Sequence, residues 1–307
     1  MLAGGVGAAR FLRGLCPLLD PARTSIIVNT ADDDTFFGLH VSPDIDTVTY
    51  TLAGRVGPHG WGLAGESFAA LEALGRYYDD TWFQLGDRDL ATHIFRTDAL
   101  RRGRTLSQIT SAIAARQGVR QRLLPMSDLP VRTRITLADV GTIAFQDYLV
   151  HRHGRGRVRA VRYAGARQAR PAPGVLAALR GAEAIILPPS NPLVSIGPIL
   201  AMSGVRAALR RHRRVAAVTP LVKGLPIKGP LDRMLRGLGH EVSVVGVARL
   251  YRDIVDVFVL DQRDAEQAPR IAALGMRPVV TDTIMRSPAQ SRALARVVLG
   301  ALAVNHR

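Results

Sequence analysis

Short runs of β-branched residues alternate with helical stretches along this chain, and this alternation constrains its fold most strongly. Strands are predicted at residues 25–29, 184–187, 215–219, 242–247, 255–260 and 278–281. Helices are predicted at residues 8–15, 196–211, 231–238, 265–274 and 288–302. Parallel strands need crossover connections, so this order predicts a Rossmann-like α/β fold with a mostly parallel sheet and helices on both faces.

The middle third of the chain departs from this pattern. Helices are predicted at residues 66–77 and 106–115, and a pair of strands at residues 131–136 and 141–149. We therefore expect one composite domain over residues 1–307, with a mixed α+β insertion at approximately residues 55–150 that covers the active-site crevice. Only three residues precede Gly4, where a strand of about five is expected. Either the first strand is shortened or the natural start lies upstream.

The formal net charge of +16 raises the question of a nucleic-acid partner. Lys223 and Lys228 are the only lysines, so the excess is almost entirely arginine, as a coding bias would produce. The densest basic run, residues 152–170, contains few aromatic residues that could stack on bases. We therefore prefer a solvated surface to an RNA-binding one. The lone cysteine, Cys16, excludes an internal disulfide framework and a cysteine zinc site.

No apolar run reaches the roughly 18 residues of a membrane span. The N-terminus also lacks a basic segment followed by an apolar one, which a secretory signal would require. These two features predict a cytoplasmic protein that does not associate with membranes.

A glycine-rich loop and a group of carboxylates lie close together near the N-terminus. The loop, GGVG at residues 4–7, precedes a predicted helix, where bare N–H groups suit a phosphate. The carboxylates are Asp32, Asp33, Asp34, Asp44 and Asp46. Carboxylates repel phosphate, so this pairing indicates a divalent metal between them, and Mg²⁺ prefers such oxygen ligands. A solvated acidic loop is the alternative.

The placement of these carboxylates favours the functional interpretation. The first three follow a predicted strand directly, and open parallel sheets bind ligands at the carboxyl ends of their strands. Asp44 and Asp46 follow Pro43 in an expected loop, where alternate residues of an extended segment face the same side. Arg10 occupies the third glycine position of a dinucleotide fingerprint, so an NAD-type site is disfavoured, and Arg10 itself could contact an anion.

Two further segments carry candidate ligand groups. The sequence GDRD at residues 86–89, with His93 after it, begins a helix. Either Asp87 or Asp89 caps that helix, or Arg88 and His93 contact a ligand. The proline-rich PPSNP at residues 188–192 leads into a helix through Ser195 and Gly197. Its small polar groups could bind a nucleotide.

Taken in order, the motifs of the chain resemble those of the 2-phospho-L-lactate transferase family. The motifs are GGVGAARFLRGL, NTADD, GLHVSPDIDTVTYTLAG, LGDRDLATHIFRT, LPMSD, FQDY, PSNPLVSIGPIL and KGP, which together cover nearly the whole chain. These enzymes act in the biosynthesis of the deazaflavin coenzyme F420. The resemblance implies that a hydroxyl of the deazaflavin Fo attacks the outer phosphate of a guanosine diphosphate-linked three-carbon acid. The products would be GMP and coenzyme F420-0 or a close analogue.

The resemblance also implies roles for individual residues. The catalytic residues would be Asp32, Asp33, Asp44 and Asp46, with Mg²⁺ held by Asp32 and Asp44. Fo would be bound by Asp46, Arg88, Asp87 and His93. The nucleotide and its phosphates would be bound by Gly4, Gly5, Gly7, Arg10, Ser190, Asn191 and Gly197. A homodimer is implied as well.

Several questions stay open at the level of sequence. The three-carbon acid could be lactate, enolpyruvate or glycerate, because all are compatible with these motifs. An NAD-dependent oxidoreductase, an RNA-binding protein and a nucleotide-binding module without catalysis are the competing functions.

Overall fold

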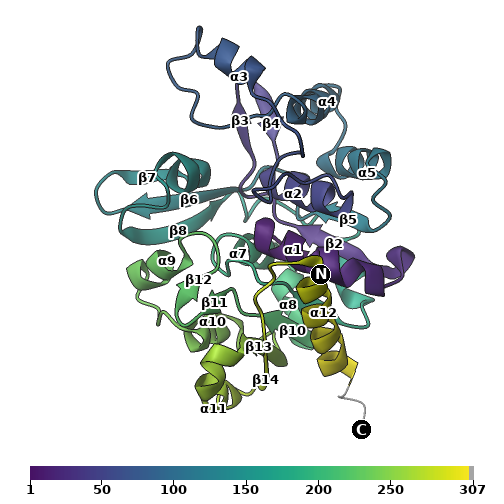
Figure 1. Ribbon diagram of the computed structural model, residues 1–307, viewed down its shortest axis with the longest axis vertical. Helices are drawn as coiled ribbons and strands as arrows, with labels where there is room; N and C mark the ends of the chain where they lie inside the picture. Colours follow the sequence, from purple (N-terminus) through teal and green to yellow (C-terminus); the bar gives the residue numbers. More distant parts are fainter. Residues whose placement is uncertain (304–307) are drawn as a thin grey trace.

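The computed structural model describes residues 1–303, and its centre is built from parallel strands (Figure 1). One sheet has the strand order β14-β13-β10-β9 and a second has the order β1-β2-β5, with every pair parallel. β1 lies beside β9, so the two sheets continue one another. The strands are β1 (Leu2–Ala3), β2 (Ser25–Val28), β5 (Arg122–Pro125), β9 (Ile185–Leu187), β10 (Val215–Val218), β13 (Val257–Asp261) and β14 (Arg277–Thr281).

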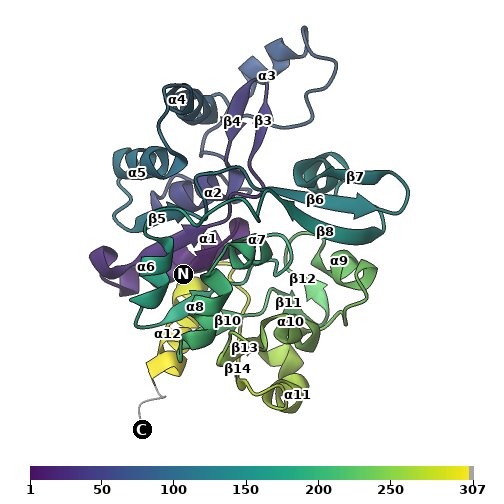
Figure 2. The same ribbon diagram turned by 180° about the vertical axis from the view of Figure 1, so that it is seen from behind.

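Helices cover both faces of these sheets, as Figures 1 and 2 show from opposite sides. One face carries α1 (Val6–Leu15), α2 (Pro43–Leu52), α5 (Leu106–Arg116) and α12 (Pro288–Ala303). The other carries α6 (Val175–Arg180), α7 (Ile196–Ala201), α8 (Val205–Arg211), α10 (Val244–Tyr251) and α11 (Ala268–Ala272). The predicted α/β architecture is confirmed.

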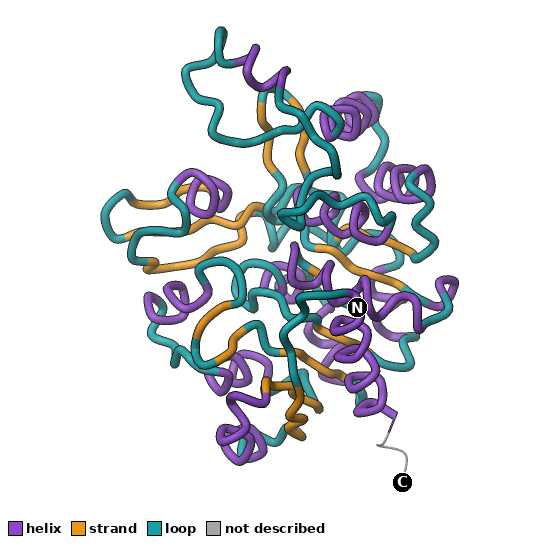
Figure 3. Tube along the Cα trace, viewed as in Figure 1, coloured by secondary structure: helices purple, strands orange, loops and turns teal. Residues whose placement is uncertain are grey.

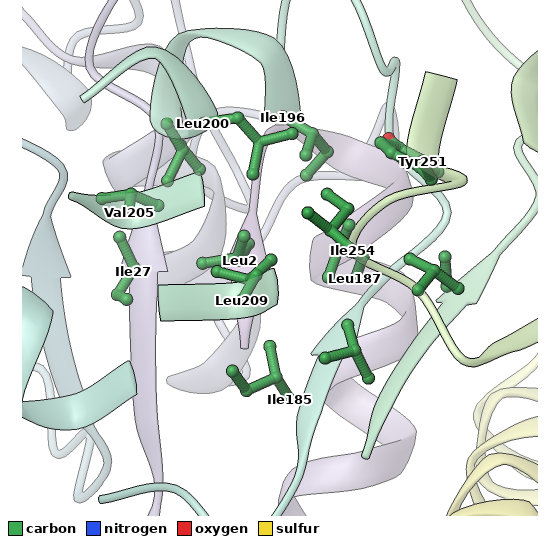
Figure 4. Close-up of a cluster of buried hydrophobic side chains, with 14 of the residues drawn as sticks. Leu2, Ile27, Ile185, Leu187, Ile196, Leu200, Val205, Leu209, Tyr251 and Ile254 are labelled. Atoms are coloured by element: carbon green, nitrogen blue, oxygen red, sulfur yellow. The ribbon is translucent and has the colours of Figure 1, made fainter. Parts of the chain in front are cut away.

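Two separate hydrophobic cores follow from the alternation of side chains along each strand. Ile185 and Leu187 of β9 point into one core, while Ile186 between them points into the other. Figure 4 shows the first core, in which Leu2 and Ile27 meet the two β9 residues and the helices of that face. Because both faces of these sheets are buried, their strands consist of continuous apolar residues. This is why most of them could be predicted from the sequence.

A smaller part of the chain projects beyond the carboxyl ends of β1 and β2. It contains a β3–β4 hairpin, three α-helices, a π-helix and an antiparallel β7-β6-β8 sheet. In Figure 3 the tip of this part is largely loop. Its elements are β3 (Asp34–Phe36), β4 (Leu39–Val41), α3 (Ala69–Leu74), α4 (Asp89–Arg101), β6 (Arg132–Leu137), β7 (Gly141–Ala144), a π-helix at Asp147–His151, β8 (Val158–Ala164) and α9 (Leu231–Gly237). β5 interrupts residues 55–150, because it pairs with β2 in the parallel sheet.

Some predicted elements were wrong for identifiable reasons. Residues 242–247 are not a strand, because Ser243 caps α10 by accepting a hydrogen bond from the N–H of Gly246. The predicted helix at residues 196–211 is broken before Gly204, which has a φ of +79°. The predicted strand at residues 141–149 ends at Ala144 and gives way to the π-helix. β5 and β8 were missed.

The remaining short elements are 3₁₀ turns at Cys16–Leu18, Pro21–Arg23 and Gln262–Gln267 and a small β11–β12 hairpin (Leu221–Val222 and Leu225–Pro226). Within residues 1–303, none of the helices combines the length and the apolar character that crossing a bilayer would need.

Candidate active site

The acidic segment begins where β2 ends, and Asn29 fixes its course. The Asn29 Oδ1 accepts a hydrogen bond of 3.0 Å from the N–H of Ala31, and its Nδ2 donates to Asp44 Oδ2 at 2.9 Å. The same Nδ2 donates to the carbonyl of Val194 at 3.3 Å. One buried amide therefore connects the end of β2, the start of α2 and the loop after β9.

Asp44 and Asp46 do not lie on an extended segment, and the prediction that they do was wrong. Both occupy the first turn of α2, where Pro43 fits the first helical position and negative charge is favoured by the helix dipole. Residues two apart on a helix are about 200° apart around its axis. Asp44 therefore faces the glycine loop and Asn29, whereas Asp46 faces α4.

Three buried carboxylates form the centre of the site: Asp32, Asp33 and Asp44. Burial raises the pKa of Asp32 well above its usual range, and the neighbouring charges of Asp44 and Asp33 raise it further. Burial likewise raises the pKa of Asp44 to about 7, although the Asn29 hydrogen bond opposes this. A cation placed here would offset the repulsion among the three charges.

Asp33 is the most constrained of the three carboxylates. Its Oδ2 accepts a hydrogen bond of 2.8 Å from the Ser42 hydroxyl and lies 3.1 Å from His40 Nε2. Ser42 precedes α2 and His40 lies on β4. Asp33 therefore has a fixed orientation within the centre.

The free oxygens of the centre suit a hard divalent cation. Asp32 Oδ1 and Asp33 Oδ1 are buried and have no hydrogen-bond partner among the described residues. A buried carboxylate oxygen without a partner destabilises the fold unless a hydrogen-bond donor or a cation contacts it. Together with Asp44, Asp32 and Asp33 offer only oxygen ligands, which is the chemistry that magnesium takes. Their side chains therefore fit magnesium by chemistry, although among the described residues the three groups whose ligand atoms all lie within 4.8 Å of one another are Asp46, Asp89 and His93.

Asp46 belongs to a different cluster, which is buried except at Asp89. Its carboxylate forms a two-pronged ion pair with the guanidinium of Arg96, which is 0% exposed. His93 Nδ1 lies 3.8 Å from Asp46 Oδ2, and His93 Nε2 lies 3.4 Å from Asp89 Oδ2. The Tyr50 hydroxyl donates to Asp89 Oδ1 at 2.5 Å. Asp46, Asp89 and His93 could geometrically hold a metal ion, but Arg96 and Tyr50 already partner the two carboxylates.

Asp87 and Arg88 take part in reciprocal contacts between two helix starts. The Asp87 carboxylate accepts hydrogen bonds from the N–H groups of Ala69 and Ala70 at the start of α3. The Glu66 carboxylate accepts from the N–H groups of Arg88 and Asp89 at the start of α4. Asp87 therefore accepts backbone N–H groups as a helix cap does, but at the start of α3. The start of α4, where the sequence predicted this cap, is capped by Glu66 instead.

The glycine loop is tightly packed against protein. A Cβ on Gly7 would lie 2.2 Å from the carbonyl oxygen of Pro189, and one on Gly4 would lie 2.3 Å from Ser195 Cβ. On Gly5 it would lie 2.9 Å from Asp44 Oδ1. The glycines thus bring α1 against the acidic centre and the loop after β9.

That loop is the third wall of the site. The Asn191 Oδ1 accepts hydrogen bonds from the N–H groups of Leu193 and Val194, so Asn191 shapes the loop. Ser190 Oγ is buried without a partner among residues 1–303. A Cβ on Gly197 would meet the hydroxyl of Tyr163 at 2.1 Å, so this glycine admits a side chain from β8.

A basic pair flanks the glycine loop. Burial lowers the pKa of Lys228, and the nearby guanidinium of Arg10 lowers it further. The Lys228 ammonium donates to the carbonyl of His59 at 3.1 Å, which joins residues 57–62 to the β11–β12 region.

Sequence reasoning missed Asn29, Arg96 and a group of aromatic residues at the β3–β4 hairpin. Phe36 stacks on Phe83 with ring centroids 3.7 Å apart, and Trp82 meets Phe36 edge to face. The dense aromatic sequence TWF at residues 81–83 was the available signal. No comparable sequence pattern marks Arg96, which is a buried arginine inside a helix.

A pH-dependent stability is predicted from Asp44. Its pKa is about 7 in the folded state and about 4 when unfolded. The folded state therefore binds the Asp44 proton more tightly than the unfolded state does. For this reason the contribution of Asp44 to the free energy of unfolding is lost as the pH rises from about 4 to about 7. In EDTA, the melting temperature should fall by on the order of 5 °C across this range, and Asp44→Asn should reduce the fall. Differential scanning calorimetry measures both, and an unchanged fall in Asp44→Asn would contradict the assignment.

Comparisons with known proteins agree over nearly the whole chain. Residues 1–299 match the family described as 2-phospho-L-lactate transferase CofD. A phosphoenolpyruvate transferase of Streptomyces griseus is 42% identical over 306 residues, covering 97% of this chain and 96% of that protein. A 2-phospho-L-lactate transferase of Methanosarcina mazei is 37% identical over 302 residues, covering 98% and 99%. A UPF0052-family protein of Bacillus halodurans has a similar fold, with a TM-score of 0.66 at 16% identity over 97% of both chains.

Proposed function

The chain belongs to the 2-phospho-L-lactate transferase CofD family, and from this we propose the reaction that its acidic centre performs. The protein transfers a phosphorylated three-carbon acid from a guanosine diphosphate-linked donor to Fo, with Mg²⁺, in the biosynthesis of coenzyme F420. The observation that carries this proposal is the buried group of Asp32, Asp33 and Asp44 beside the glycine loop. We expect the enzyme to work as a cytoplasmic homodimer.

In this reaction the terminal hydroxyl of Fo attacks the outer phosphorus of the donor. A bond forms between that oxygen and phosphorus, and the bond from the outer phosphorus to the bridging oxygen breaks. GMP leaves with the electron pair, and the hydroxyl proton is lost. Magnesium would neutralise the charge on the phosphates. Asp32 and Asp44 would hold it, and Asp33, fixed by Ser42 and His40, would orient the attacking hydroxyl.

The aromatic residues of the hairpin support a flat acceptor such as Fo. Phe36, Trp82 and Phe83 are partly exposed, and Phe36 directly follows the acidic segment on β3. Aromatic faces bind planar rings by offset stacking or edge contacts. A deazaflavin ring placed there would direct its ribityl chain toward Asp33. Arg88, which is exposed at the start of α4, remains a further candidate for binding Fo.

The donor's acid is the open part of this proposal, because the two relatives described above are named for phosphoenolpyruvate and for 2-phospho-L-lactate. Purified protein should be incubated anaerobically with Fo, magnesium and each of three guanylylated acids: lactate, enolpyruvate and glycerate types. Mass spectrometry should find GMP and a phosphodiester of Fo with at least one donor, and the preferred donor names the acid. Folded protein that forms no adduct with any donor contradicts the proposed function.

A further inference from the structure

We propose that Arg132 and Arg134 of β6 bind the carboxylate of the three-carbon acid that the enzyme transfers. This inference rests on the proposed function, because it assigns a subsite to one part of the donor. It concerns the start of β6, which belongs to the β7-β6-β8 sheet and lies against the acidic segment. The family motifs quoted above include neither arginine.

Backbone contacts bring β6 directly against the acidic segment. The N–H of Thr133 donates to the carbonyl of Ala31 at 2.7 Å. The Gln146 side chain, just beyond β7, donates to the carbonyl of Asp32 at 3.1 Å. In Figures 1 and 2 the start of β6 accordingly lies at the foot of the β3–β4 hairpin. Arg132 and Arg134 flank Thr133, and both line the same hollow as Asp32, Asp33 and Asp34.

Both arginines share a small hollow with the acids. Its lining includes Asp32, Asp33 and Asp34 together with Arg132 and Arg134. Its volume of about 10 Å³ has room for a single water molecule or small ion. The hollow is too small to hold the donor itself. We therefore place the donor outside its opening, within reach of the long side chains of Arg132 and Arg134.

Neither guanidinium is already neutralised. Within residues 1–303, no carboxylate lies within ion-pair distance of Arg132 or Arg134, although Arg132 Nη1 donates to the carbonyl of Val131 at 3.1 Å. Arg134 is exposed and Arg132 is half-buried. Because the two are two residues apart on one strand, they extend from the same side of the sheet.

The chemistry of the transferred group calls for such a pair. A three-carbon acid carries its own carboxylate, which Asp32, Asp33 and Asp34 would repel if nothing balanced it. The guanidinium group is planar and can donate two parallel hydrogen bonds to a carboxylate, which a lysine cannot do. Arg132 and Arg134 therefore give the enzyme a means to choose donors that carry an acid.

The test compares two donors in the same assay. One donor carries the acid that wild-type protein prefers, and the other carries the matching carboxamide. Wild type should favour the acid, and Arg132→Gln or Arg134→Gln should lower kcat/KM for the acid donor by about 10- to 100-fold. For the carboxamide donor the same variants should change kcat/KM less than threefold. The preference for the acid should thus disappear.

The matched control is Arg162 of β8, which pairs with Arg134 across the sheet but does not line the hollow. Arg162→Gln should leave the preference for the acid donor intact. If this variant loses as much kcat/KM for the acid donor as the Arg132 and Arg134 variants do, the proposal is wrong, because the general positive potential of the sheet would then explain the preference. Equal losses for acid and carboxamide donors would also overturn it, because the arginines would then bind phosphate. If wild-type protein is active and the Arg132 and Arg134 variants still prefer the acid donor, this inference is wrong but the proposed function stands. If wild-type protein is inactive with every donor, the proposed function itself is wrong.

Discussion

Asp32→Asn should lower the transfer rate by about two to three orders of magnitude and, at the same time, stabilise the protein. The activity should fall because the proposed magnesium would lose one negatively charged ligand, and single electrostatic groups at such centres contribute on this scale. The stability should rise because the Asp32 carboxylate is buried beside Asp44 and Asp33, which raise its pKa by repulsion. Burying a neutral amide removes that repulsion.

The measurement is a melting curve in EDTA at about pH 8.5, where the unfavourable charge is present, paired with a rate measurement in magnesium. A rise of a few degrees is expected for Asp32→Asn. Asp34→Asn is the matched control, because Asp34 lies two residues away on β3 and is partly exposed. Its melting temperature should stay within about 1 °C of wild type. An Asp32→Asn protein that is less stable and retains full activity would show that Asp32 is a structural residue.

The second large effect concerns the buried ion pair between α2 and α4. Arg96→Met should lower the free energy of unfolding by about 3–5 kcal/mol, because the Asp46 carboxylate would stay buried without its partner. Urea denaturation measures this loss. The same helix offers a matched control in the exposed pair of Arg102 with Asp98. Arg102→Met should cost less than about 0.5 kcal/mol.

A double-mutant cycle separates the charge from the packing at this site. Asp46→Asn combined with Arg96→Met should be more stable than Arg96→Met alone, since the buried negative charge is then absent. If the two substitutions add without coupling, then the ion pair is not what holds α4 against α2. Packing around Arg96, rather than the charge pair, would then hold the two helices together.

Sequence patterns located most of the parallel strands, although not β5, because burial on both faces produces continuous apolar runs. The acidic segment was also located correctly, since it follows β2 directly and the carboxyl ends of parallel strands form the ligand-binding edge. The helix at Pro43–Leu52 was missed, although Pro43 and two first-turn acids are typical of a helix start. Treating the segment as extended placed Asp44 and Asp46 wrongly on one side.

The rest depended on contacts between distant residues. Asp46 and Arg96 are separated by 50 residues, and Asn29 reaches Val194 across 165 residues. Nothing local in the sequence reveals such pairs. The arginines of residues 152–170 are mostly exposed, as predicted for a solvated surface. The same run also contains β8, which was not predicted, and its Tyr163 packs beside Gly197 in the helix after the β9 loop.

The most direct test of this account is to follow an oxygen label in the acceptor. Fo carrying ¹⁸O in its terminal hydroxyl should be incubated with magnesium, the enzyme and the preferred donor, and both products examined by mass spectrometry. The account predicts that the label stays in the phosphodiester of Fo and that the released GMP is unlabelled, because the hydroxyl oxygen attacks the outer phosphorus. Attachment of the labelled oxygen to the guanosine-bearing phosphate, or loss of the label to water, would contradict it.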